Sequence, residues 1–162
     1  MEELRLIFDF CERTRKMVIV HTGCDPGPWE DPRLSNVARP SRFKQILSEF
    51  PDVHVILAHA GSYSIKFPGI WLDEALEICR KNDNVWVDIA AVTYLVFEGK
   101  FMEKIRKEIG VSRILFGSDY PVVAGKAVKD SINDILTSKE ISDEEAEQIL
   151  CLNALEILKH IK

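Results

Sequence analysis

Apolar residues recur along the chain in two patterns that alternate. Short apolar runs rich in valine and isoleucine predict buried parallel strands, at 17–21, 53–59, 85–89 and 113–119. Apolar residues spaced three or four positions apart predict amphipathic helices, at 2–16, 43–50, 68–79, 101–109 and 127–137. A capping box, Ser142 to Glu145, predicts a last helix that runs to about 161. This alternation is typical of a parallel α/β fold.

The spacing of the strands fits two fold classes and does not distinguish between them. The strands begin near 18, 53, 85 and 114, so 35, 32 and 29 residues separate them. A (β/α)8 barrel allots about 31 residues to each unit, and a small doubly wound sheet fits the same alternation. The chain has 162 residues, fewer than the roughly 200 that a complete barrel needs. We therefore expect a single domain, 1–162, that is not a complete barrel.

Composition and charge exclude several classes of protein. Apolar residues make up 46% and charged residues 29%, and the net charge is −5, a balance typical of a soluble globular protein. The acidic surface predicts no nucleic-acid partner and no anionic membrane partner. No apolar run reaches the roughly 18 residues of a membrane span. With an acidic first segment and four cysteines without a CxxC pair, a cytoplasmic location is expected.

Three predicted strands end in a side chain that can bind a metal. The first ends in His21, the second in His59 and the fourth in Asp119, and each histidine is followed by a small residue and glycine. Carboxyl ends of parallel strands share one edge of the sheet, where the site of such folds lies. Either histidine alone would be an ordinary polar residue. Together, two imidazoles and a carboxylate favour Zn²⁺ or another divalent first-row metal.

Three further residues near the strands are weaker candidates for the metal site. His54 comes five positions before His59, so strand alternation predicts that it points to the opposite face and lies at the opposite end. His160 falls in a last helical turn, where partial positive charge is favourable. Both are predicted to be structural. Asp88 ends the third strand and either faces the site or caps the next helix.

Charged residues in the loops beyond the strands are candidates for substrate binding. These are Asp25, Arg39 and Lys66. A basic side chain there could bind a substrate carboxylate. Solvated surface charge is the alternative.

Five motifs occur in a fixed order: VIVHTG, FPDVHVILAHAG, NVWVDIA, RILFGSDYP and then Asn153-Ala154. In these motifs the whole chain resembles the amidohydrolase superfamily, in its amidohydrolase-related branch. The resemblance implies a (β/α)8 barrel with one or two metal ions, of which this chain carries four βα units like strands five to eight plus a C-terminal helix. It implies that His21 binds metal, that His59 acts as acid or base or binds a second metal, and that Asp119 binds metal and takes a proton. Zinc is the expected ion, with manganese and iron as alternatives.

The resemblance also sets the expected chemistry. Family members hydrolyse amide, ester or lactone bonds of small molecules, and some of this branch decarboxylate aromatic acids without oxidation. The family's His-x-His pair has no counterpart in this sequence. Activity is therefore expected only in a completed barrel, formed by two copies or with a separate N-terminal half-barrel chain. The alternative is an inactive half barrel that is structural or contributes residues to a partner. A flavodoxin-like binding module lacks support, because no glycine-rich phosphate loop follows a strand.

Overall fold

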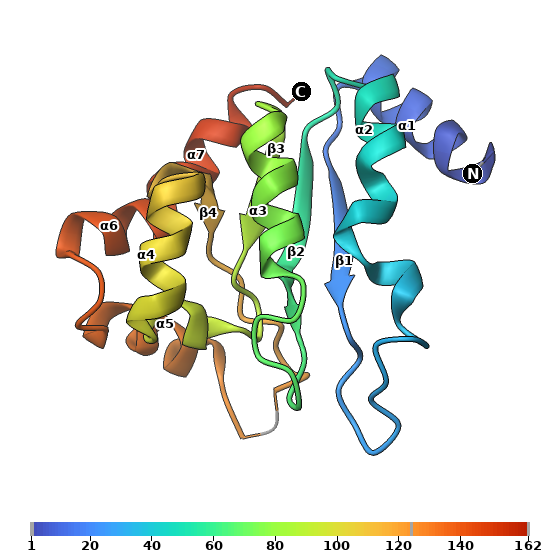
Figure 1. Ribbon diagram of the computed structural model, residues 1–162. Helices are drawn as coiled ribbons and strands as arrows, with labels where there is room; N and C mark the ends of the chain where they lie inside the picture. Colours follow the sequence, from blue (N-terminus) through green and yellow to red (C-terminus); the bar gives the residue numbers. More distant parts are fainter. Residues whose placement is uncertain (1, 124, 162) are drawn as a thin grey trace.

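The predicted strands form one parallel sheet in the order β1-β2-β3-β4 (Figure 1). The computed structural model describes residues 2–123 and 125–161. The strands are β1 (Val18–Gly23), β2 (Val55–Tyr63), β3 (Val85–Asp88) and β4 (Ile114–Leu115). Their register places Val18 beside Val55 and Val55 beside Val85. The parallel α/β arrangement predicted from the apolar runs is confirmed.

The helices follow the predicted order, with bounds that differ from the predicted ones by a few residues. They are α1 (Glu2–Thr14), α2 (Lys44–Glu49), α3 (Leu72–Lys81), α4 (Gly99–Glu108), α5 (Val128–Thr137), α6 (Asp143–Glu147) and α7 (Asn153–Leu158). The predicted capping box begins α6, since Ser142 and Glu145 exchange backbone-to-side-chain hydrogen bonds of 2.9 and 3.3 Å. The predicted last helix is interrupted, because a π-helical turn, Gln148–Leu152, separates α6 from α7. Short 3₁₀ turns occupy Asn36–Ala38, Pro40–Phe43, Thr93–Val96 and Val111–Arg113.

The ends of two strands lie four residues from their predicted positions. The second strand does not end at His59 but continues to Tyr63, through a left-handed turn at residues 59–61. The fourth strand was predicted over 113–119 and covers only Ile114–Leu115. It ends there because the next amide, that of Phe116, bonds to the carbonyl of Ile149 at 3.0 Å instead of to a strand.

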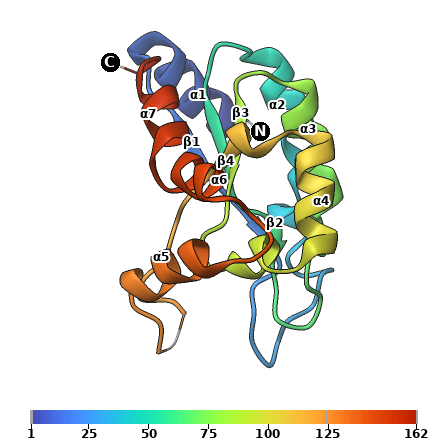
Figure 2. The same cartoon turned by 90° about the vertical axis from the view of Figure 1, so that its left-hand side faces the viewer.

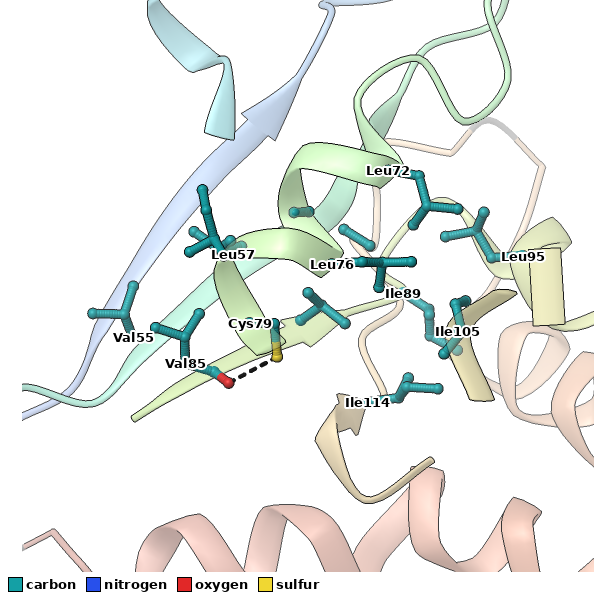
Figure 3. Close-up of a cluster of buried hydrophobic side chains, with 14 of the residues drawn as sticks. Val55, Leu57, Leu72, Leu76, Cys79, Val85, Ile89, Leu95, Ile105 and Ile114 are labelled. Carbon is teal, nitrogen blue, oxygen red and sulfur yellow. Dashed lines mark hydrogen bonds between the residues drawn. The ribbon is translucent and has the colours of Figure 1, made fainter. Parts of the chain in front are cut away.

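Strand alternation gives the sheet two unlike faces. One face packs against the large core under α3 and α4 (Figure 3), and we call it the helical face. It carries Val55, Leu57, Val85, Val87 and Ile114. Side chains in between point to the other side, the open face, where Ile56, Trp86 and Leu115 meet Ile157 of α7. Figure 2 shows α3 and α4 on one side of the sheet and α7 on the other. On β1 the open face carries Ile19, which is 63% exposed.

The C-terminal segment covers the outer edge of β4. The carbonyl of Ile149, in the π-helical turn, accepts the hydrogen bond from Phe116. The side-chain amide of buried Asn153 donates to the carbonyls of Val111 and Ile114, both at 2.8 Å. These bonds satisfy backbone groups that would otherwise be left unpaired at a sheet edge. The other edge, β1, has no strand on its outer side within the part of the chain that the structure describes.

Replacing Asn153 by alanine should lower the free energy of unfolding by about 2 kcal/mol, because two buried carbonyls lose their donor. Urea denaturation followed by circular dichroism measures the loss. Asn133→Ala is the matched control: its residue is exposed on α5, so its change should stay within about 0.5 kcal/mol. Equal stability of the two variants would contradict the role given to Asn153.

His54 lies at the amino-terminal end of the strands, between two aromatic rings. Its ring centroid is 5.3 Å from that of Trp86 and 5.0 Å from that of His160. Its Nδ1 is buried and has no hydrogen-bond partner among the described residues. Burial lowers the pKa of His54 below 6.5, and the nearby charge of His160 lowers it further, while Asp52 acts in the opposite direction. The folded protein therefore favours the neutral ring.

Stability should consequently rise between about pH 5 and pH 7. The unfolded chain, whose histidine has its ordinary pKa of about 6.5, binds the proton more strongly than the folded chain. The stabilisation is thus complete above that pKa and is lost as the pH falls through it. Urea denaturation across this range should give a flatter pH dependence for His54→Phe than for the unchanged protein. An identical slope in both proteins would show that His54 does not contribute.

No helix within residues 2–123 and 125–161 is both long enough and apolar enough to cross a membrane.

Candidate functional site

Three aromatic rings from two neighbouring strands meet at the carboxyl edge of the sheet. His21 is on β1, and His59 and Tyr63 are on β2. The ring centroids of His21 and His59 are 5.0 Å apart, edge to face. Tyr63 stacks on His59 at 4.5 Å and meets His21 edge to face at 5.4 Å. The structure thus brings the two strand-end histidines together and adds a tyrosine to them.

His59 reaches this group because the backbone leaves the strand conformation at that residue. His59, Ala60 and Gly61 have φ of 64°, 49° and 70°, the left-handed region that residues with a side chain rarely adopt. In a regular strand, His59 would point with Leu57 to the helical face. The prediction that His54 and His59 point to opposite faces is therefore wrong: His54 contacts Trp86, and His59 contacts His21, both on the open face.

Groups from β1 and from the end of β3 hold this left-handed turn. The Asp88 carboxylate accepts hydrogen bonds from the amides of His59 at 2.8 Å and Ala90 at 3.0 Å. The Ala90 carbonyl lies 2.8 Å from Nδ1 of His59. The buried Thr22 hydroxyl donates to the Ala58 carbonyl and accepts from the Gly61 amide at 2.9 Å. Of the two alternatives predicted for Asp88, the structure favours the first: its carboxylate lies beside His59 and its charge acts on His21, whereas the next helical turn begins after Val92.

Asp119 follows β4 and also has a left-handed backbone, with φ of 55°. Its carbonyl accepts a hydrogen bond from the amide of Val122 at 2.8 Å, and the peptide bond between Tyr120 and Pro121 is cis. The negative charge of Asp119 acts on His21 and on Tyr63. The third candidate therefore lies close enough to this group of rings for its charge to act on two of them.

Burial dominates the electrostatics of the site. It lowers the pKa of His21, as does the charge of His59, while Asp25, Asp119 and Asp88 oppose the change. Burial also raises the pKa of the Tyr63 hydroxyl, and the charges of Asp119 and Asp25 add to this. These groups therefore favour a neutral imidazole and a protonated phenol.

Burial raises the pKa of Asp88 as well. Its hydrogen bonds with the His59 and Ala90 amides oppose the rise, and the charge of Asp119 contributes to it. Two carboxyl groups near each other disfavour ionisation of both at once. Asp88 and Asp119 therefore influence one another across the site.

Of the predicted substrate-binding residues, one lies beside the rings. Asp25 places Oδ1 at 3.5 Å from Nε2 of His21. Arg39 instead forms an ion pair with Glu74, with Nε 2.6 Å from Oε1. Lys66 places Nζ at 3.4 Å from the carbonyl of Glu30. Whether Arg39 or Lys66 binds a substrate stays a prediction, since their described contacts are with other loop and helix groups.

An apolar hollow of about 270 Å³ lies beside the ring group. Loops from all four strands line it, among them residues Pro26, Tyr63, Ile65, Val92 and Val122. Sequence reasoning missed Tyr63, although an aromatic residue two positions after a strand-end glycine was a usable signal. Because Tyr63 touches both the hollow and His59, a molecule bound in the hollow would lie next to the histidines.

The donor set limits what the site can hold. Among the residues that the structure describes, no group of three or more histidine, cysteine, aspartate and glutamate side chains is arranged to hold a metal ion. His21 and His59 are in ring contact and the charge of Asp119 acts on His21, but the three do not form such a group. The described residues do not by themselves fit a complete metal site, so an ion there would need ligands from elsewhere.

The comparison with protein families decides the family. The family model described as Amidohydrolase matches residues 2–159. The chain belongs to the amidohydrolase family. This membership confirms the resemblance carried by the five motifs. No curated protein is significantly similar to the chain.

Solved structures similar to this amidohydrolase chain have a barrel fold. An uncharacterised TIM-barrel protein from Bordetella bronchiseptica is 26% identical with a TM-score of 0.71, and the match covers 97% of this chain and 50% of that one. A putative 2-pyrone-4,6-dicarboxylic acid hydrolase from Pseudomonas putida is 15% identical with a TM-score of 0.69, covering 96% and 56%. A dihydroxybenzoic acid decarboxylase from a Polaromonas species, solved with bound manganese and an inhibitor, is 16% identical with a TM-score of 0.63, covering 98% and 54%.

The chain spans about half the length of these structures. The prediction of a partial (β/α)8 barrel is thereby confirmed. Because the similar proteins include both decarboxylases and a hydrolase, membership of the family leaves the reaction open.

Proposed function

We propose that this chain supplies one half of the active site of a metal-dependent amidohydrolase, and that the enzyme is active only when its barrel is completed. The observation that carries the proposal is the meeting of His21 and His59, 5.0 Å apart, at the carboxyl edge of the sheet and within the field of Asp119. Carboxyl edges of parallel strands are where barrel enzymes carry out their chemistry. The completing strands would come from an N-terminal half barrel, with a second copy of the chain as the alternative.

In this proposal His59 handles the proton, and His21 and Asp119 contribute to the metal site. A carbonyl oxygen can only accept a hydrogen bond, so the bond from His59 to Ala90 places a proton on Nδ1. Nε2 of the neutral ring is then free to accept a proton from the substrate or to act as a ligand. His21 and Asp119 would contribute to a site for a divalent ion whose other ligands lie outside the described residues. Zinc is the ion we propose first, with manganese and iron next.

The hollow beside the rings indicates the size and polarity of the substrate. Its walls are apolar and include no charged side chain among the residues lining it. It would hold a small molecule with an apolar body, whose reacting group reaches His59 past Tyr63. We propose hydrolysis of a C–O or C–N bond in such a molecule. The apolar lining also favours a second candidate, decarboxylation of an aromatic acid.

Titration calorimetry with Zn²⁺ tests the contribution of these residues. His21→Asn and Asp119→Asn should each weaken binding at least about tenfold, a factor that even loss of an outer partner of a metal site can produce. His160→Asn, which alters a histidine at the opposite end of the strands, is the control and should bind as the unchanged chain does. Equal affinity in all four proteins would contradict the proposal.

The reaction is tested in a protein that holds all eight strands. Hydrolysis of 2-pyrone-4,6-dicarboxylate and release of CO₂ from dihydroxybenzoate distinguish the two candidates. In either case His59→Asn should abolish turnover. Turnover that survives this change would show that His59 is not the acid or base.

A further inference from the structure

His59 occupies a position that the strand alone would not give it. Leu57, two residues earlier, packs in the core under the helices, and regular alternation would send His59 to the same side. Instead, three successive residues adopt left-handed φ values. For the two that carry a side chain, this conformation is unfavourable. Strain of this kind persists only where the surroundings enforce it.

Asp88 enforces it from β3. One oxygen, Oδ1, accepts the amide of His59 at 2.8 Å and the amide of Ala90 at 3.0 Å. The first bond holds the residue at which the left-handed turn begins. The second holds Ala90, whose carbonyl lies 2.8 Å from Nδ1 of the His59 ring. A single carboxylate thus connects both the backbone and the ring of His59 to the end of β3.

Thr22 holds the same turn from β1. Its hydroxyl donates to the carbonyl of Ala58, just before the turn, and accepts the amide of Gly61, at its end, at 2.9 Å. Thr22 is fully buried, so no water competes for these bonds. Thr22 directly follows His21 in the chain. The strand β1 therefore both carries His21 and holds the turn that contains His59.

We infer that Asp88 and Thr22 are positioning residues, which turn His59 onto the open face and hold its ring with the proton on Nδ1. This inference rests on the proposed function, since it concerns the histidine that we place in catalysis. It extends that proposal by assigning a role to a β3 carboxylate and a β1 hydroxyl, which bond to different backbone groups of the turn. Both act through His59.

The state of the His59 ring in the unligated chain tests this inference directly. Long-range ¹H–¹⁵N spectra of the histidine-labelled chain, recorded at about pH 8 where imidazoles are neutral, report which nitrogen carries the proton. The unchanged chain should show His59 protonated on Nδ1 alone. Asp88→Ala should lose this single form, and Asp88→Asn, whose side-chain oxygen can accept the same two amides, should keep it. Asp73→Ala, at an exposed position on α3, is the control.

Amide exchange provides the second readout. Loss of one hydrogen bond should speed exchange about tenfold, at His59 in Asp88→Ala and at Gly61 in Thr22→Val. Thr22→Ser retains the hydroxyl and should exchange as the unchanged chain does. If Asp88→Ala does not fold, the comparison of the near-isosteric Thr22→Val with Thr22→Ser decides, because Thr22→Val should also lose the single ring form.

Three results would overturn the inference: an unchanged His59 ring in folded Asp88→Ala, an unchanged ring in Thr22→Val, or loss of the single form in Asp88→Asn. A substitution that merely destabilised the fold would leave the protonated nitrogen of His59 unaltered in the molecules that remain folded. The measurement uses neither metal nor substrate. A failed zinc titration beside a confirmed ring form would therefore reject the proposed function alone.

Discussion

Gly23→Ala should lower the free energy of unfolding by about 3–5 kcal/mol, combining the strain of an unfavourable backbone with that of an overpacked site. Gly23 ends β1 with φ of 142°, and an added Cβ would lie 2.3 Å from Cβ of Tyr63 and 2.6 Å from its backbone nitrogen. Neither of these atoms can move without displacing β2. We therefore expect Tyr63 to shift off the ring of His59, which it now contacts at 4.5 Å.

Gly125→Ala is the matched control for this substitution. Gly125 also has a positive φ, 74°, but an added Cβ would meet no atom within 4 Å. Gly125→Ala should lower the free energy of unfolding by only about 1 kcal/mol, the strain of placing a side chain at a positive φ. Urea denaturation gives both values, and nuclear Overhauser contacts between Tyr63 and His59 report the displacement. Equal costs for the two alanines would show that the close approach of β1 to Tyr63 does not matter.

Leu57→Ala should cost about 3–4 kcal/mol, within the range for large buried aliphatic side chains. Leu57 lies in β2, one of the two inner strands, is fully buried and packs in the core under α3 (Figure 3). Deleting its branched end leaves a cavity that neighbouring strands cannot fill.

Ile19→Ala tests whether the two faces of the sheet differ as described. Ile19 sits on β1 in register with Ile56 but is largely exposed, so its loss should cost less than about 1 kcal/mol in this chain. The midpoint of urea unfolding compares the two variants. In a completed barrel the open face becomes the interior, and the same substitution should then approach the cost of Leu57→Ala. A cost that stays small in the completed barrel would contradict that placement of Ile19.

The sequence predicted the layers of the fold well, because burial on both sides of a parallel strand leaves a continuous apolar run. It predicted strand ends poorly. β4 stops after Leu115 because the next amide bonds to Ile149, more than thirty residues later, and no local pattern records that bond. The π-helical turn that divides the last helix was equally hidden, since Gln148–Leu152 reads as ordinary helical sequence.

The sequence identified the two histidines of the candidate site, but it did not reveal the residues that hold His59 in place. Strand ends identified His21 and His59, because carboxyl ends of parallel strands share an edge. The left-handed backbone at His59 could not be predicted from the sequence. Because it breaks the alternation of a regular strand, the prediction that His54 and His59 point to opposite faces was wrong. Thr22 and Asp88 act through that conformation, so their importance appears only once the turn is known.

The two edges of the sheet also determine how copies of this chain can associate. Head-to-tail addition of parallel strands would join β1 of one copy to β4 of the next, and repetition of that contact closes a ring or, where the rotation does not close, extends a fibre. Here β4 is already occupied by its own Ile149 carbonyl and Asn153 amide. In this conformation the β4 edge is covered while β1 has no strand on its outer side among the described residues. We therefore expect that copies do not stack head to tail in this conformation, and that completing a barrel requires the C-terminal segment to leave the β4 edge.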